Sequence, residues 1–417
     1  MANQAPIQLS ERNNGERSRA MKRIVILCDG TWNRADSETP TNVVRLGQAL
    51  RPTDRSGTVQ VPIYVQGVGT GEGVTFWSQT LDRILGGALG WGLTENIVEA
   101  YRHLVFLYEP GDEISILGFS RGAYTARSLS GFIRCTGIIA RDDLSLLPQA
   151  VSRYRERGNR ELNPRSERSL AFRAHVMRSR VATGGDEENT WRRSKGLPEV
   201  PLFRIAYLGV WDSVGALGVP SHIPLLGKLT ARRYEFHDAD LSSMVASARH
   251  AVALDEQRRS FEPTLWTNVA TLNEEVGAGS DGEPQYQQLY FSGDHGSVGG
   301  GGDITELSSI GLTWIMDGAT AAGLEFNTER ILNIKSEHNP YGPLRNQSRP
   351  PQGLIDRLTR LRPQERKGPV SIEEVHPSVL LRCAKQETND LSYKPSSLYR
   401  IAPQIFDRSF SANFLPH

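Results

Sequence analysis

Short apolar runs alternate along the chain with stretches of helical periodicity. Apolar residues recur three to four positions apart through 94–104, with Thr94 placed as a cap, and through 123–132. A final helix is predicted near 377–383. Runs with the length and composition of buried strands occupy residues 23–28, 62–66, 113–118, 202–211 and 287–291. Strands that alternate with helices predict an α/β fold, with a mostly parallel sheet covered by helices on both faces.

The segments between these elements differ from them in composition. Residues 153–195 hold twelve basic and six acidic side chains, and residues 220–249 mix short apolar patches with polar turns. We interpret the regions near 150–200 and 220–249 as lid or cap insertions that cover one end of the sheet, because long connections often form active-site lids. From residue 339 a Pro- and Arg-rich stretch predicts an irregular extension on the surface. Residues 1–21 are polar and predicted to be a disordered lead-in to one domain, 22–417.

Composition narrows the class of protein. Of 417 residues, 38% are apolar, and 48 basic side chains nearly balance 47 acidic ones, so no global charge attracts nucleic acid. The cysteines Cys28, Cys135 and Cys383 are too scattered for a disulfide framework or a thiolate zinc site. The most apolar stretch, 73–93, contains an Asp-Arg pair and several glycines, which argues against a membrane span. We expect a protein that is cytoplasmic in the producing cell or exported by a non-classical secretion system.

Residues 118–122 read Gly-Phe-Ser-Arg-Gly and join an apolar strand to a helical pattern. A G-x-S-x-G sequence in this context is typical of a nucleophile elbow, whose glycines make room for a strained turn that exposes the serine hydroxyl. The turn also places the amide of Arg121 at the positive end of the following helix, where it can donate to an oxyanion. We therefore predict Ser120 as a nucleophile. The alternative is an ordinary Gly-Ser turn.

A serine nucleophile needs a base and a group that orients the base. On this type of sheet the chain order is Ser, then Asp or Glu, then His, each after a strand. Asp212 follows the run that ends at Trp211, and His295 follows the run that ends at Phe291, so both satisfy the order. His376 is the rival base, although a helix follows it and no strand precedes it. The alternative for Asp212 is a helix cap or turn residue.

The second oxyanion donor is expected on a loop after another strand. Gly30 and Thr31 follow the first predicted strand, and Gly30 allows close approach to a substrate. Asp29 is interpreted as a residue that holds this loop by accepting local N–H groups. His250, by contrast, precedes an apolar run predicted to be helical, where a lone histidine is usually structural.

Several blocks in the same order make the chain resemble the catalytic-domain family of type VI secretion phospholipase effectors (Tle1-like), an α/β-hydrolase family. These blocks are residues 28–33, 67–71, 118–127, 209–215, 248–251, 255–258 and the His295 loop. The resemblance implies Ser120 as nucleophile, Asp212 as orienting acid, His295 as base, and ester hydrolysis on glycerophospholipids. The chain departs from the family at the histidine loop. The resemblance implies a histidine followed by Ser and by Asp or Asn, whereas Gly296 follows His295 here and Asp294 precedes it.

The favoured function is a serine hydrolase of the phospholipase A, lipase or esterase type, acting through an acyl-enzyme without cofactor or metal. A metal-assisted hydrolase, with ligands from Asp29, Asp294, His295 and Asp303, is one alternative. A catalytically inactive interaction module on a hydrolase scaffold is another. The expected partners are a lipid or small ester and transiently a membrane surface, but no nucleic acid.

An apolar set ahead of the elbow is one candidate for membrane contact. These residues lie among glycines, as a mobile lid would require. The alternative interpretation, which is favoured on general grounds, is that they fill the core beneath a loop. The set comprises Phe76, Trp77, Leu81, Ile84, Leu85, Leu89 and Trp91.

Overall fold

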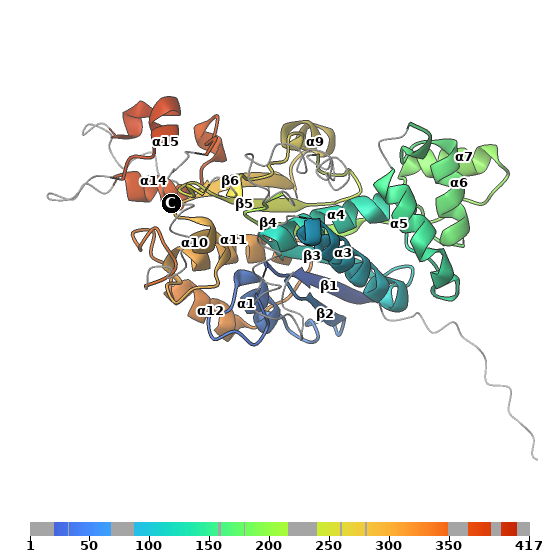
Figure 1. Ribbon diagram of the computed structural model, residues 1–417, viewed down its shortest axis with the longest axis horizontal. Helices are drawn as coiled ribbons and strands as arrows, with labels where there is room; N and C mark the ends of the chain where they lie inside the picture. Colours follow the sequence, from blue (N-terminus) through green and yellow to red (C-terminus); the bar gives the residue numbers. More distant parts are fainter. Residues whose placement is uncertain are drawn as a thin grey trace, which may run out of the picture.

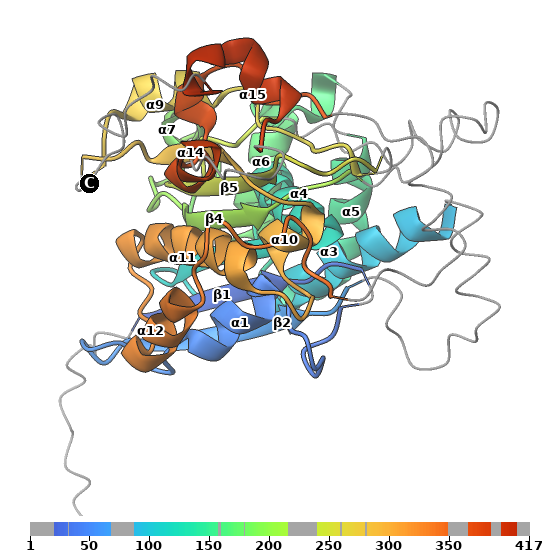
Figure 2. The same cartoon turned by 90° about the vertical axis from the view of Figure 1, so that its left-hand side faces the viewer.

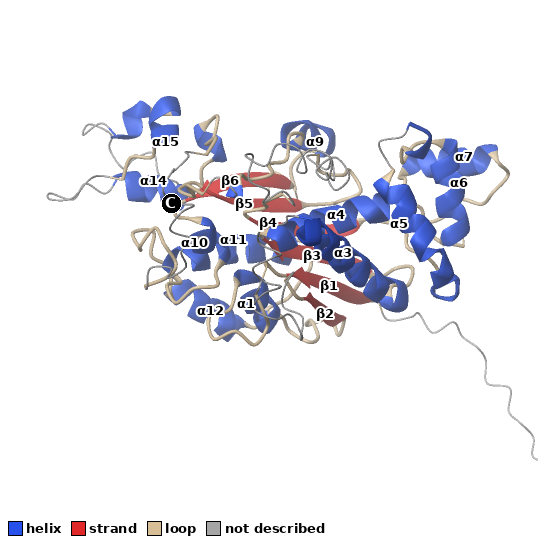
Figure 3. Cartoon of the chain, in the orientation of Figure 1, coloured by secondary structure: helices blue, strands red, loops and turns tan. Residues whose placement is uncertain are grey.

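The computed structural model has at its centre a six-stranded sheet in the order β2-β1-β3-β4-β5-β6, with every neighbouring pair parallel (Figure 3). Helices lie on both sides of it, so the predicted α/β class with a parallel sheet is confirmed. The structure describes residues 21–31, 33–67, 87–156, 160–178, 180–215, 240–258, 261–279, 282–348, 366–384 and 393–406.

The strands are β1 (Lys22–Cys28), β2 (Val59–Val65), β3 (Glu113–Phe119), β4 (Ile205–Trp211), β5 (Ala248–Ala253) and β6 (Tyr286–Phe291). The longer helices are α1 (Asn42–Ala49), α3 (Gly87–Leu107), α4 (Arg121–Thr136), α5 (Leu147–Arg155), α6 (Glu167–Val176), α7 (Asp186–Ser194), α9 (Val269–Val276), α11 (Glu306–Ala321), α12 (Thr328–Ser336) and α14 (Pro377–Ala384). The described residues also include the short helices α10 (His295–Gly299) and α15 (Ser396–Ile401). Five strands and the helices α4 and α14 lie where the sequence pattern predicts them.

The prediction of a helix at His250 is wrong. This residue lies in β5, which pairs with β4 on one side and β6 on the other. A short apolar run is compatible with either a buried strand or a buried helix, and pairing on both edges decides for the strand. The insertion predicted near 220–249 therefore ends before β5 begins at Ala248, and its residues 220–239 lie outside the described residues.

Helix α3 begins at Gly87, seven residues before the predicted cap at Thr94. The glycines of this stretch lower helix propensity without forbidding a helix, because each costs only about 1 kcal/mol relative to alanine. The proposed lid residues between Phe76 and Leu85 lie outside the described residues. Leu89 and Trp91 lie in the first turns of α3, where the structure describes the backbone and not the side chains.

Two cores pack against opposite faces of the sheet. Alternate residues of β1 point to opposite sides, so Ile24 and Ile26 contact the layer that contains α3 and α4. Val25 and Leu27 instead contact the layer that contains α1 and α11 (Figures 1 and 2). A third cluster joins α14 and α15 to the sheet near β5 and β6. The parallel arrangement brings the carboxyl ends of all six strands to one edge.

The Arg-rich segment 153–195 contains α6, α7 and the end of α5, beside α4 (Figure 1). Its charged side chains pair within the segment or with nearby acids, as in Arg165–Glu187 at 3.1 Å and Lys195–Glu167 at 2.6 Å. Among the described residues, no helix combines the length and apolar character needed to cross a bilayer.

Candidate active site

Ser120 occupies a strained turn between β3 and α4. Its backbone has φ 59° and ψ −124°, a combination that L residues rarely adopt. The amide of Ser120 donates to the carbonyl of Trp211 at 3.0 Å, which ties the turn to the end of β4. The side chain of Ser120 does not cap α4, although the residue stands at the N-cap position. The hydroxyl is therefore not consumed by the helix it precedes.

The two elbow glycines are sterically required. A Cβ atom on Gly118 would lie 2.4 Å from the carbonyl oxygen of Gly122, and one on Gly122 would lie 2.2 Å from that of Cys28. Both contacts involve backbone atoms, which cannot move aside as a flexible side chain can. The strand, the turn and the helix consequently approach one another only because these positions lack side chains, as the sequence motif predicts.

Asp212 and His295 meet at the same edge of the sheet. Asp212 follows β4, and its Oδ2 accepts a hydrogen bond from His295 Nδ1 at 2.5 Å. His295 opens the short helix α10, which Asp294 caps by accepting from the amide of Ser297 at 2.9 Å. The structure thus brings together the predicted acid and base, which lie 83 positions apart in the chain.

The carboxylate of Asp212 is fully buried and surrounded by donors. Its Oδ1 accepts from the amide of Ala253 at 2.9 Å and from Arg366 Nη1 at 2.7 Å, while Oδ2 accepts from Arg366 Nη2 at 2.8 Å. Burial opposes ionisation, but the Arg366 guanidinium and His295 outweigh it and hold the pKa of Asp212 well below its usual range. Asp212 is therefore ionised at neutral pH.

Arg366 is a site residue that the sequence analysis missed. It lies in the stretch predicted as an irregular surface extension, yet its side chain is almost completely buried. The prediction of a surface location is wrong at this residue because the guanidinium finds a buried carboxylate 154 positions away. No local pattern of apolar spacing signals such a distant partner.

Aromatic rings hold the imidazole of His295 from two sides. Phe119 lies 4.6 Å from it, centroid to centroid, and Phe261 meets it edge-on at 4.7 Å. The backbone amide of His295 donates to Glu256 Oε2 at 3.2 Å. Burial works against the charge of Glu256, but its pairing with Arg258 lowers its pKa to about 2. These contacts fix both the ring and the backbone of the candidate base.

The competing histidines are structural. His376 stacks on Phe291 at 4.4 Å, and its Nδ1 pairs with the hydroxyl of Ser378 at 2.8 Å. His250 accepts from the amide of Ser213 through Nε2 at 3.2 Å, and its Nδ1 lies 3.0 Å from Gln288 Oε1. Burial lowers the pKa of His250 to about 3 and that of His376 to about 4, so both are neutral.

The loop after β1 lies beside the elbow. A Cβ atom on Gly30 would lie 3.2 Å from Ser120 Cβ. Asp29 anchors this loop by accepting from the amide of Gly30 at 2.7 Å, from the hydroxyl of Thr41 at 2.9 Å and from that of Tyr64 at 2.8 Å. Because the amide of Gly30 is already engaged by Asp29, Thr31 is the better candidate of the two for an oxyanion donor. Arg121 begins α4 on the other side of Ser120.

The acidic residues considered as metal ligands have separate partners. Asp29 holds the β1 loop, Asp294 caps α10, and Asp303 accepts from the amide of Ser348 at 2.9 Å. Among the described residues, no group of three or more His, Cys, Asp or Glu side chains is arranged to hold a metal ion. The donors therefore do not converge as the metal-assisted alternative requires.

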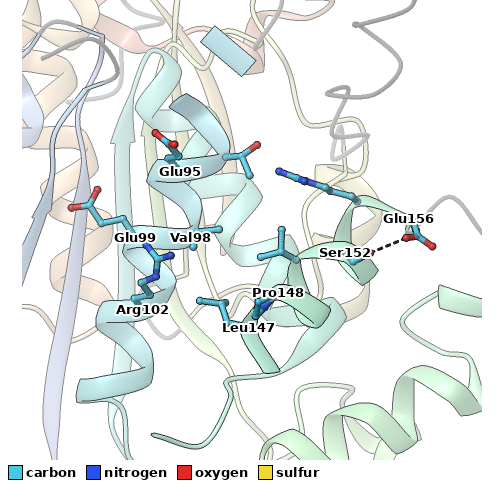
Figure 4. A pocket seen from close by; sticks show the side chains of 11 residues that line it. Glu95, Val98, Glu99, Arg102, Leu147, Pro148, Ser152 and Glu156 are labelled. Atoms are coloured by element: carbon cyan, nitrogen blue, oxygen red, sulfur yellow. Dashed lines mark hydrogen bonds between the residues drawn. The ribbon is translucent and has the colours of Figure 1, made fainter. Parts of the chain in front are cut away.

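A groove of about 940 Å³ lies between α3 and α5 (Figure 4). Its lining combines apolar Val98 and Leu147 with charged residues such as Glu99 and Arg102. None of the described lining residues belongs to the Ser120 site, and none of them is a histidine or cysteine. The hydroxyl of Ser152 in this groove donates to Glu156 Oε1 at 2.9 Å (Figure 4).

The model of the type VI secretion system phospholipase effector Tle1-like catalytic domain matches residues 22–318. The chain belongs to this family. The matched region contains Ser120, Asp212 and His295, and ends before Arg366. Membership in a family of phospholipase effectors supports a hydrolase that acts on lipids, and the elbow on a parallel sheet is that of an α/β-hydrolase.

An uncharacterized protein of Saccharomyces cerevisiae is 26% identical over 265 residues, which make up 61% of this chain and 34% of the yeast protein. An uncharacterized protein from Pseudomonas aeruginosa has 19% identity and a TM-score of 0.36, covering 77% of this chain and 49% of that chain. The Tle1 effector bound to the VgrG spike of the type 6 secretion system has 16% identity and a TM-score of 0.34, covering 69% and 52%. The chain therefore spans about a third of the yeast relative and about half of the two solved chains.

Proposed function

We propose that this protein is a serine hydrolase that cleaves carboxylic esters of phospholipids or related lipids through an acyl-enzyme at Ser120. The observation that carries the proposal is the 2.5 Å hydrogen bond from His295 to the buried Asp212, at the sheet edge where the strained elbow presents Ser120. A nucleophile, a base and an acid that orients the base are the three parts this chemistry needs.

The proposed reaction begins when His295 Nε2 accepts the proton of the Ser120 hydroxyl as Oγ attacks the ester carbonyl. Asp212 holds the proton of Nδ1, which keeps Nε2 available, and stabilises the imidazolium that forms. Backbone amides of Arg121 and Thr31 are the proposed donors to the oxyanion. His295 then protonates the departing alcohol or lysolipid, and water activated by the same imidazole releases the acid from Ser120.

Family membership supports a phospholipid as the ester. We propose that the domain acts on the surface of a membrane and that type VI secretion exports it from the producing cell. The full-length relatives are longer than this chain, so their partners are not carried over to it. The proposed chemistry uses only side chains and backbone amides of the chain.

A fluorophosphonate probe and phosphatidylcholine vesicles test this function. The wild-type protein is expected to be labelled at Ser120 and to release fatty acid and lysolipid. Ser120→Ala is expected to lose labelling, and both Ser120→Ala and His295→Ala are expected to lose about 10⁴-fold or more in hydrolysis, because triad members act as a unit. Ser128→Ala, which removes another hydroxyl from α4, is the matched control and should retain labelling.

Hydrolysis that persists in Ser120→Ala and disappears with a chelator would instead support the metal-assisted alternative. A folded wild-type protein that neither reacts with the probe nor hydrolyses any lipid would support the inactive interaction module.

A further inference from the structure

Arg366 contacts both oxygens of Asp212. Its Nη1 donates to Oδ1 at 2.7 Å and its Nη2 donates to Oδ2 at 2.8 Å, which is the parallel two-bond geometry favoured by guanidinium and carboxylate groups. Oδ2 is also the atom that accepts from His295 Nδ1. A carboxylate held at both oxygens cannot rotate, so this pairing fixes the direction in which Oδ2 meets the imidazole.

The same guanidinium joins three parts of the site. Nη1 donates to the carbonyl of Ala253, the last residue of β5, at 2.9 Å, and Nη2 donates to the carbonyl of Phe261. The ring of Phe261 packs edge-on against His295. Arg366 therefore holds the acid directly and also holds the backbone of a residue that contacts the base.

The segment that supplies Arg366 lies outside the matched family region, which ends at residue 318. It is nevertheless seated firmly. Helices α14 and α15 share a buried cluster with Val252 of β5 and Tyr290 of β6. Tyr393 also donates its hydroxyl to Asp255 Oδ2 at 2.6 Å, two residues after β5 ends. The C-terminal segment thus reaches the catalytic edge at two places.

We propose that Arg366 is a positioning residue, which orients Asp212 for His295 and sets the strength of their pairing. This inference rests on the proposed function of the Ser120 site. It assigns two roles to one side chain. The two-bond contact provides orientation, and the positive charge reduces the affinity of the Asp212–His295 pair for a proton.

The second role predicts a shift in pH dependence. Other charged groups near the pair are Glu256, Arg258 and Glu262. Arg127 acts electrostatically on the neighbouring His250. None of these forms a described hydrogen bond to the carboxylate of Asp212. Removal of the Arg366 charge leaves the pair more negative, so the pair binds a proton at higher pH. This holds for the pair as a whole, whichever of the two side chains carries the proton.

Kinetics of Arg366→Gln and Arg366→Lys test the proposal. Initial rates are measured on a soluble short-chain phosphatidylcholine from about pH 5 to about pH 9, which spans the titration of a catalytic histidine. In Arg366→Gln we expect kcat to fall about 10- to 100-fold with little change in KM, and the acid limb of kcat/KM to move up by about one pH unit. Arg366→Lys keeps the charge and loses the two-bond contact, so we expect a lower kcat with an unmoved acid limb.

Arg382→Gln is the matched control. This arginine of α14 donates to the carbonyls of Pro340 at 2.8 Å and Gly342 at 2.6 Å and forms no described hydrogen bond to Asp212 or His295. We expect its acid limb to coincide with that of the wild type. An unmoved limb in Arg366→Gln, or an equal shift in Arg382→Gln, would overturn the proposal. If Arg366→Gln does not fold, Arg366→Lys still tests orientation, because an unchanged kcat in that variant contradicts it.

Failure of the proposed function is distinguishable from failure of this inference. The proposed function fails if the wild-type protein hydrolyses no ester or if Ser120→Ala stays active. In either case, NMR titration of the His295 imidazole still tests the effect of Arg366 on the Asp212–His295 pair. The inference then requires that titration to occur at higher pH in Arg366→Gln than in the wild type, and an identical midpoint contradicts it.

Discussion

Ser120 and Asp212 share an uncommon backbone conformation. Among the described residues other than glycine, positive φ occurs at Ser120 (59°), Arg178 (47°) and Asp212 (37°). Such conformations cost of order 1–3 kcal/mol each and persist only where the surroundings enforce them. Hydrogen bonds from neighbouring strands do so here, since the amide of Ser120 donates to Trp211 and the amide of Asp212 donates to Ala251 at 2.7 Å. Positive φ thus occurs at two of the three residues to which we assign chemistry.

Asp212→Asn tests the role of the carboxylate at the scale of one residue. Asparagine tolerates positive φ well, so the turn should be retained while the negative charge is lost. The imidazole of His295 is then expected to adopt the wrong tautomer. We expect kcat/KM to fall by about 10⁴-fold, which is the loss known for the same substitution of the triad aspartate in a serine protease.

The measurement is kcat/KM on phosphatidylcholine together with thermal unfolding. The variant also leaves the buried guanidinium of Arg366 without its charged partner, so some loss of stability is expected. Activity within about tenfold of the wild type, well short of the loss typical of a triad acid, would identify Asp212 as a structural turn residue instead.

At the scale of elements, the site depends on where strands end. Asp29 follows β1, Ser120 follows β3, Asp212 follows β4 and His295 stands shortly after β6. Because all six strands are parallel, these loops share one edge, which is where α/β folds bind ligands. β5 contributes no catalytic side chain, yet the carbonyl of Ala251 and the amide of Ala253 hold Asp212 in place.

Gly122→Ala tests the packing of the elbow. The added Cβ would lie 2.2 Å from the carbonyl oxygen of Cys28, so the helix and β1 must separate. We expect a loss of about 3 kcal/mol or more in the free energy of unfolding and a large loss of hydrolysis, since Ser120 begins the displaced turn. Chemical denaturation and fluorophosphonate labelling measure the two effects.

Gly215→Ala is the control for this substitution. Its nearest neighbour would be Thr264 Oγ1 at 3.5 Å, an ordinary contact, so stability and labelling should stay near wild-type values. Equal effects of the two alanines would argue that the elbow does not require close backbone approach.

Across the whole molecule, the C-terminal segment and the sheet meet at the partly exposed residue Asp255. Asp255 accepts from Tyr393 at 2.6 Å and from the amide of Gly293 at 2.6 Å, close to His295. Burial raises its pKa from 3.8 to about 6 despite these hydrogen bonds. The folded protein consequently holds this proton more tightly than the unfolded chain does.

Linkage then sets the sign of the pH dependence. Between about pH 4 and pH 6 the folded state binds more protons at Asp255 than the unfolded state, so this group makes the protein less stable as pH rises. The stabilisation of the folded state by the protonated Asp255 carboxyl group is fully present below about pH 4 and is lost above about pH 6. A shift of about two pKa units corresponds to about 3 kcal/mol.

Asp255→Asn should remove this contribution while keeping an acceptor for Gly293 and Tyr393. Relative to the wild type, we expect the variant to gain about 2–3 kcal/mol in the free energy of unfolding between pH 4 and pH 7. Urea denaturation of both proteins across that range measures the difference. A difference that does not vary with pH would show that Asp255 is not the group responsible.

Sequence patterns alone predict the α/β class, five of the six described strands, and Ser120, Asp212 and His295 as candidate catalytic residues. These features are local, because a buried parallel strand, a Gly-Phe-Ser-Arg-Gly turn and an ionisable residue after a strand can each be recognised within a few neighbouring positions. The same local reasoning failed at β5, because the identity of a short apolar run depends on which strands pair with it.

The contacts of the acid depend on the fold, which brings both His295 and Arg366 to Asp212. His295 lies 83 positions and Arg366 154 positions from Asp212. A buried carboxylate attracts compensating donors from wherever the fold brings them, and the free energy of that pairing depends on burial and geometry, which a linear pattern does not encode. The contacts of Arg366 with Asp212 and of Glu256 with His295 therefore form only because the fold places separate parts of the chain around one edge of the sheet.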